Sequence, residues 1–209
     1  MGECSHKAKK KREASLKQVS EMSLSELAAR VCSHLRQHGI SVVLSGGSVV
    51  SIFTENRYQS NDLDFIENVS HSRKQLKKIM EELGFREENR YFIHPETDFF
   101  VEFPSGPLSV GNEPVKEVFE IKTKTGILRI ISPTECVKDR LCAYYHWKDL
   151  QSLEQAKWVS EKHPIHWKEV QRWSNQEGME NEFKKVLKIL RAEPPHRVFK
   201  RMHKNSFSK

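Results

Sequence analysis

The stretch SVVLSGGSVVSIFTENRYQSNDLDFI, residues 41–66, decides how this chain folds and where its chemistry lies. It holds an apolar run typical of a buried strand, a Gly-Gly-Ser turn, an apolar helix-like run and the pattern Asp-Leu-Asp-Phe-Ile. Because strand side chains alternate between faces, Asp62 and Asp64 are expected to share one face. Two carboxylates this close repel each other unless a divalent cation lies between them, so the pair predicts a metal site.

The turn before this pair predicts a place for phosphate. Gly46 and Gly47 allow the backbone to turn tightly with no Cβ in the way, and Ser48 begins the next helix. Free N–H groups at a helix N-terminus suit phosphate oxygens. We therefore predict that Gly46, Gly47 and Ser48 bind phosphates. Taken singly, the Gly-Gly-Ser motif has a plain structural turn as its alternative, and the Asp-x-Asp motif has a solvated strand end.

The same stretch resembles the signature of the nucleotidyltransferase superfamily, which also includes DNA polymerase beta. The resemblance rests on Leu44-Ser45-Gly46-Gly47-Ser48, then Arg57, Ser60 and Asp62-Leu63-Asp64-Phe65, and covers residues 41–103. It points to the small prokaryotic branch that includes antibiotic nucleotidyltransferases and the toxins of abortive-infection type toxin–antitoxin systems. The resemblance implies an α+β fold, in which a mixed sheet flanked by helices is followed by a helical C-terminal domain.

The resemblance also implies an activity. Such enzymes move a nucleoside monophosphate from an NTP to a hydroxyl acceptor, with Mg²⁺ or Mn²⁺ held by Asp62, Asp64 and a third carboxylate. The implied acceptor is RNA, such as tRNA, or a protein, in a toxin–antitoxin or phage-defence setting with an antitoxin protein as a partner. Two alternatives are an inactive nucleotidyltransferase-fold module that binds nucleotide or a partner, and a small-molecule (antibiotic) nucleotidyltransferase.

The third carboxylate is predicted on a later strand. The run Asp98-Phe99-Phe100-Val101-Glu102-Phe103 alternates, with Asp98 and Glu102 on one face. Glu102 lies among apolar residues, where an unpartnered carboxylate is costly, so it is predicted as the catalytic and metal-binding residue. The family more commonly has Asp at this position. Asp98 is the alternative, as is a surface role for Glu102 on an edge strand.

The last third of the chain is predicted to be helical. Ser132-Pro133-Thr134-Glu135 forms a capping box with Pro at the first helical position. In the family, the helix after the sheet often aims a basic residue at the triphosphate, so the resemblance implies Arg140 or Lys148 as nucleotide-binding residues. Surface charges without a specific role are the alternative for both.

The other elements follow from periodicity and turn residues. A capping box at Ser23 and Glu26 starts the first helix, and Gly39 ends it. The loop at 104–114 is either a gate for acceptor or nucleobase, or a plain connector. The expected elements are a helix at 23–38, a helix at 71–83, strands at 85–93 and 98–103, a hairpin of 115–123 with 126–131, and helices near 149–161, 166–175 and 178–191.

Composition places the chain among soluble globular proteins. Its 209 residues are 37% hydrophobic and 30% charged, and no apolar run approaches membrane-spanning length. The basic N-terminus has no apolar segment of a secretory signal, and the four cysteines show no Cys-x-x-Cys spacing, so a reduced cytoplasmic protein is expected. A zinc site of Cys136, Cys142 and His146 is disfavoured, because helical spacings of six and four suit it poorly.

The net charge of +7 is concentrated at the two ends. Residues 1–20 carry +4 and residues 194–209 carry +5, which leaves −2 on the remainder. Basic tails suit RNA phosphates, and solvated disordered tails are the alternative. We expect basic tails at 1–20 and 194–209, a nucleotidyltransferase-like domain at 21–131 and a helical domain at 132–193.

Overall fold

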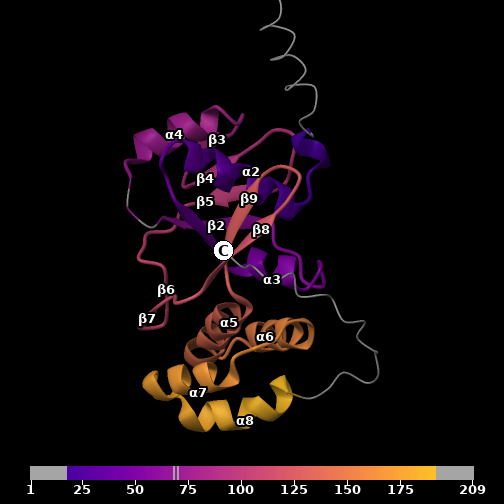
Figure 1. The fold of residues 1–209 in the computed structure, drawn as a ribbon, viewed down its shortest axis with the longest axis vertical. Helices are drawn as coiled ribbons and strands as arrows, with labels where there is room; N and C mark the ends of the chain where they lie inside the picture. Colours follow the sequence, from indigo (N-terminus) through magenta and orange to yellow (C-terminus); the bar gives the residue numbers. More distant parts are fainter. Residues whose placement is uncertain (1–17, 68, 70, 192–209) are drawn as a thin grey trace, which may run out of the picture.

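The computed structural model describes residues 18–67, 69 and 71–191 (Figure 1). The expected basic tails lie outside the described residues, except for residues 18–20. In chain order the elements are η1 (Val19–Glu21), α2 (Leu24–Gln37), β1 (Val42–Ser45), α3 (Gly47–Phe53), β2 (Asp62–Glu67), α4 (Arg73–Glu81), β3 (Arg86–Glu88), β4 (Tyr91–Ile93), β5 (Phe100–Glu102), β6 (Ser109–Val110), β7 (Glu113–Pro114), β8 (Val118–Lys122), β9 (Ile127–Ile131), α5 (Pro133–Trp147), α6 (Leu150–Lys162), α7 (Trp167–Gln176) and α8 (Glu180–Leu190).

A mixed seven-stranded sheet, in the order β3-β4-β5-β2-β1-β9-β8, forms the centre of the fold. Strand β1 is antiparallel to β2 and parallel to β9, while β2 is parallel to β5. Helices α2 and α4 lie on one side of the sheet, and α5, α6, α7 and α8 form a group beyond the other side (Figure 1). The predicted α+β class, a mixed sheet flanked by helices and followed by further helices, is confirmed.

Helix α2 shows why its sequence folds as predicted. The Ser23 hydroxyl accepts from the Glu26 N–H, and the Glu26 carboxylate accepts from the Ser23 N–H, so the capping box is complete. The helix packs its apolar stripe on β1 and β9, and this stripe is fully buried at Leu27, Val31 and Leu35. The buried core begins before residue 21, because Val19 of η1 is only 5% exposed.

Two predicted strands differ in the structure. Residues 85–93 form a hairpin of β3 and β4 rather than one strand, because Asn89 adopts a left-handed conformation with φ of 56° and reverses the chain. Strand β4 then pairs antiparallel with β5. Strand β5 is shorter than predicted, so Asp98 is exposed and lies before the strand rather than on its face.

The predicted loop at 104–114 contains the small hairpin of β6 and β7. This hairpin packs on the helical group, where the Trp173 indole donates to the Val110 carbonyl at 3.2 Å. The cap of α5 also differs from the prediction. The Ser132 hydroxyl accepts from the Glu135 N–H, but the Glu135 carboxylate binds the Lys138 ammonium at 3.0 Å instead of closing a capping box.

The helical group touches the sheet through α3 and α6. Arg57 donates to Glu161 at 2.7 Å, and Lys162 donates to the Thr54 carbonyl at 3.1 Å. These contacts place the last turn of α6 against the end of α3. In the part of the chain that the structure describes, no helix is both long and apolar enough to cross a bilayer.

Candidate active site

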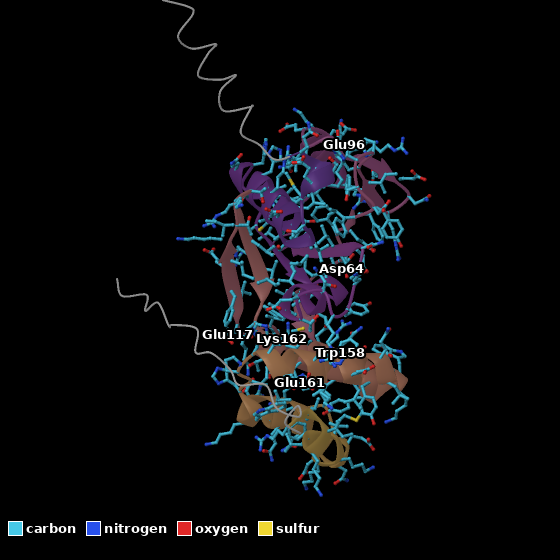
Figure 2. All side chains as sticks on the ribbon, turned by 90° about the vertical axis from the view of Figure 1, so that its right-hand side faces the viewer. Asp64, Glu96, Glu117, Trp158, Glu161 and Lys162 are labelled. Carbon is cyan, nitrogen blue, oxygen red and sulfur yellow. The ribbon has the colours of Figure 1, made fainter. Side chains whose placement is uncertain are left out.

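Three predicted carboxylates meet at the middle of the sheet. Asp62 and Asp64 project from β2, and the register of the parallel pair sets Asp64 opposite Glu102 of β5. All three residues are partly buried. Figure 2 shows Asp64 on the side of the sheet that faces α6, where Trp158 and Glu161 are labelled. The structure therefore brings Asp62, Asp64 and Glu102 into one region.

Alternation along β2 explains why the carboxylates face this way. The Phe65 ring stacks on Phe103, Phe103 packs on Phe92, and Arg73 of α4 covers Phe92 at 4.5 Å. Phe65 therefore points toward α4 and is fully buried. Because successive strand residues alternate, Asp64 points away from α4 and toward the helical group.

The electrostatics of this cluster favour a bound cation. Burial, together with the negative charges of Asp62 and Glu102, raises the pKa of the Asp64 carboxyl to about 7. The positive charge of Arg140 opposes this shift without cancelling it. A divalent cation would supply the missing positive charge and would lower the same pKa.

The glycine turn leaves no room for a side chain beside the Asp64 carboxylate. Gly46 has φ of 74°, and a Cβ built on it would overlap the Asp64 carboxylate. A Cβ on Gly47 would lie 3.0 Å from the Ser60 hydroxyl and 3.3 Å from the Tyr58 ring. Gly46 is thus required for close approach of the backbone to Asp64, and Gly47 is closely packed against Ser60 and Tyr58. The Ser48 side chain is buried and donates to the Ser45 carbonyl at 3.3 Å, which leaves only its backbone for a ligand.

Two side chains hold the carboxylates in place. The Ser60 hydroxyl donates to Asp62, and the Ser60 N–H is itself held by the Ser51 hydroxyl at 3.0 Å. Arg90, on the turn between β3 and β4, places Nε 3.2 Å from the Glu102 carboxylate. The Arg90 side chain is 69% exposed, so this ion pair is weak and open to competition.

The two predicted basic residues lie in different surroundings. The Arg140 side chain is 17% exposed and donates to Asp139 at 3.1 Å. Its positive charge lowers the pKa of Asp64, so it lies within electrostatic reach of the site. Lys148 is exposed at the end of α5, with its ammonium 5.4 Å from the Tyr144 ring. None of the contacts in the described residues brings Lys148 to the carboxylates.

A cavity of about 210 Å³ lies beside Asp64. Ile66 contributes to its wall two residues after Asp64 on the same strand face, and Ser45 and Asp139 also line it. Residues 105 and 107–110 form much of the remaining wall, so the predicted gate or connector borders the site.

A scan against models of protein families finds no match, and a search of curated proteins finds none either. Among solved structures, the solution structure of the antibiotic-resistance factor ANT(2'')-Ia is similar, with 13% identity and a TM-score of 0.44 over 80% of this chain and 94% of that chain. The crystal structure of ANT(2")-Ia in complex with adenylyl-2"-tobramycin has 14% identity and a TM-score of 0.45 over 78% of this chain and 98% of that chain.

The carboxylate cluster fits a divalent cation by its chemistry. Oxygen donors suit Mg²⁺ and Mn²⁺, and burial together with the charges of Asp62 and Glu102 raises the pKa of Asp64, which a bound cation would lower. Among the described residues, the oxygens of Asp62, Asp64 and Glu102 do not all lie within 4.8 Å of one another. The present partners of these carboxylates are Ser60 for Asp62 and Arg90 for Glu102.

Sequence reasoning missed Arg90 and Asp139. Arg90 reaches Glu102 only because residues 85–93 fold back as a hairpin, and its sequence carries no signal for this contact. Asp139 precedes Arg140 on α5 and lines the cavity beside Asp64. Its position next to a predicted phosphate-binding residue was the available signal.

Proposed function

We propose that this protein is a metal-dependent nucleotidyltransferase that moves a nucleoside monophosphate from an NTP to a hydroxyl acceptor. The observation that carries the proposal is the pairing of Asp64 with Glu102 on neighbouring parallel strands, with Asp62 on the same face, directly beside the Gly46 turn. A negatively charged cluster next to a backbone without side chains suits cations and phosphates together.

Asp62, Asp64 and Glu102 would hold the divalent ions, Mg²⁺ or Mn²⁺. When bound, such ions neutralise charge on the triphosphate and lower the pKa of a bound hydroxyl. Glu102 would also help to take the proton from the acceptor hydroxyl, for which it must leave Arg90. Ser60 would orient Asp62.

The glycine turn and Arg140 would hold the triphosphate. Gly46 and Gly47 present backbone without a Cβ, so the β- and γ-phosphates can approach the N–H groups up to Ser48. The Arg140 guanidinium, whose charge already lowers the pKa of Asp64, would add a positive charge. Lys148 stays a prediction for nucleotide binding, since its described contacts are with Tyr144 rather than with this site.

The acceptor is proposed as RNA, such as tRNA, or a protein, with an antitoxin as a partner in a toxin–antitoxin or phage-defence system. The basic segments 1–20 and 194–209 support the RNA acceptor. A second candidate is a small-molecule acceptor. The cavity of about 210 Å³ supports it, because the Asp139 carboxylate in its wall would attract the amino group of a small ligand in competition with Arg140.

The test is transfer of label from each α-³²P NTP in the presence of Mg²⁺ or Mn²⁺. Total RNA, lysate protein and an aminoglycoside such as tobramycin are the three acceptor arms. We expect label in one arm, with loss of at least a hundredfold in Asp62→Asn and Asp64→Asn and none in Asp98→Asn. Transfer that persists in the Asp62→Asn/Asp64→Asn double variant contradicts the mechanism. Nucleotide binding without transfer in any arm would show that the protein is a nucleotide-binding module rather than an enzyme.

A further inference from the structure

A second cluster of donor atoms lies on the other side of the sheet, where α2 and α4 end (Figure 1). His34 belongs to the last turn of α2, His38 caps that helix, and Glu82 caps α4. His34 and His38 are four residues apart and therefore lie on one helix face. Their Nε2 atoms are 3.2 Å and 3.0 Å from the same Glu82 oxygen, Oε2.

The His34 side chain brings an unsatisfied ring nitrogen to this cluster. Its Nε2 atom is buried and has no hydrogen-bond partner among the described residues. The ring also interacts with the backbone of Ile79, a bond that raises its pKa and therefore comes from the other ring nitrogen as a donor. In the neutral ring, the Nε2 lone pair then faces a carboxylate oxygen. Two lone pairs at 3.2 Å repel each other unless a positive charge lies near both.

An ion placed between the three donor atoms would face both the unpartnered His34 Nε2 atom and the Glu82 carboxylate.

The distances fit a tetrahedral metal ion. With metal–ligand bonds of about 2.0–2.1 Å, neighbouring ligand atoms of a tetrahedral site lie about 3.3 Å apart. The observed separations from Glu82 Oε2 are 3.2 Å to His34 and 3.0 Å to His38. The donor atoms of all three residues lie within 4.8 Å of one another. Little movement is then needed to close the three ligands around one ion.

We propose that His34, His38 and Glu82 bind Zn²⁺ or a similar transition-metal ion, with a fourth position open to water. Two imidazoles and one carboxylate suit Zn²⁺ better than Mg²⁺. The carbonyl ends of both α2 and α4 point toward the site, and their partial negative charge favours a cation. The His34 contact with the Ile79 backbone orients the ring as outer hydrogen bonds do for metal-binding histidines.

This site differs from the carboxylate cluster in place and in donor type. It joins the C-terminal ends of α2 and α4, which lie on one side of the sheet (Figure 1), whereas Asp64 points away from α4. A bound ion would tie these two helices together, so we infer a stabilising role rather than a role in transfer.

The test is competition for Zn²⁺ between a chromophoric chelator and the full chain without an affinity tag, under reducing conditions and in excess Mg²⁺. His38→Ala and Glu82→Gln are the informative variants, because both side chains are more than a third exposed and their loss leaves the core intact. We expect each to weaken Zn²⁺ binding at least tenfold. His146→Ala, an exposed histidine on α5 whose side chain is 39% exposed, is the matched control and should bind as the wild type does.

Two further measurements distinguish one specific metal site from nonspecific binding by surface histidines. Co²⁺ should give an intense visible absorption band of a tetrahedral site in the wild type, and this band should be absent from His38→Ala. Zn²⁺ should raise the melting temperature of the wild type and of Asp64→Asn, but not of Glu82→Gln. Equal Zn²⁺ affinity in wild type, His38→Ala and Glu82→Gln would overturn the proposal.

Discussion

The surroundings of Asp64 make the stability of the protein depend on pH in the absence of metal. Its pKa is about 7 in the folded protein, against 3.8 as the ordinary value. The folded state therefore retains a proton that the unfolded state releases between these two values. The contribution of Asp64 to stability is full below about pH 4 and is lost as pH rises to about 7.

We predict that Asp64→Asn removes this pH dependence in EDTA. The amide cannot ionise, so the variant should gain about 2 kcal/mol over the wild type at pH 8 and almost nothing at pH 4, after allowance for partial exposure. Urea unfolding at the two pH values measures both numbers. Asp98→Asn, on an exposed carboxylate before β5, is the control. Identical pH slopes in Asp64→Asn and wild type would show that Asp64 ionises normally.

Sequence alone predicted the identity of the carboxylates but not their partners. Asp62 and Asp64 follow from strand alternation, and Glu102 follows from its apolar neighbours. The contact with Arg90 depends on a reversal at Asn89, and a left-handed conformation at a non-glycine residue has only a weak sequence signal. Local patterns thus place residues on a face, whereas tertiary folding decides what lies opposite them.

At the scale of elements, capped helices were predictable and short strands were not. Helix α2 begins within one residue of the prediction because Ser23 and Glu26 specify the cap locally. Strands β3 and β4 have three residues each, too few for a period-two pattern to stand out. At Ser132 only one of the two hydrogen bonds of the predicted capping box forms, for another reason. The Glu135 carboxylate instead binds the buried Lys138 ammonium on the next helical turn. No local sequence rule predicts this ion pair.

The turn between β1 and α3 carries the element-scale prediction. We expect Gly46→Ala to lower Mn²⁺ affinity and transfer at least tenfold, because the new Cβ would overlap the Asp64 carboxylate. Gly178→Ala is the matched control, with φ of 73° against 74° for Gly46 and no atom within 4 Å of its Cβ. Gly178→Ala should lose about 1 kcal/mol from strain at positive φ. Gly46→Ala should lose more, because its ψ of −156° lies in a region that residues with a Cβ almost never adopt, and urea unfolding measures both. Equal Mn²⁺ affinity in the two variants would show that the Gly46 turn does not contribute to the metal site.

At the scale of the whole molecule, a buried ion network joins the small hairpin to the helical group. Lys138 is fully buried, and its ammonium lies 3.0 Å from Glu113 of β7 and 3.0 Å from Glu135 of α5. Arg172 of α7 also binds Glu113 at 2.6 Å. Although burial opposes the shift, hydrogen bonds from Arg172 and Lys138 hold the pKa of Glu113 at about 2. The network therefore spans β7, α5 and α7 with charges that depend on one another.

We predict that Lys138→Met destabilises the protein by about 3–5 kcal/mol at pH 7, because the uncharged side chain fills the space but leaves the Glu135 carboxylate buried without its cation. Lys116→Met is the control, since Lys116 binds the same Glu113 but its side chain is 50% exposed, and it should cost no more than about 1 kcal/mol. Urea unfolding gives both values.

The pH dependence of the same variant tests the electrostatic explanation. Glu113 has a lowered pKa, so the stability it contributes is present above its ordinary value of 4.5 and is lost as pH falls toward about 2. Removing the Lys138 charge weakens the interaction that lowers this pKa. The acid-side loss of stability should therefore be smaller in Lys138→Met than in the wild type. A constant difference between the two proteins from pH 7 to pH 3 would assign the cost of Lys138→Met to packing instead of charge.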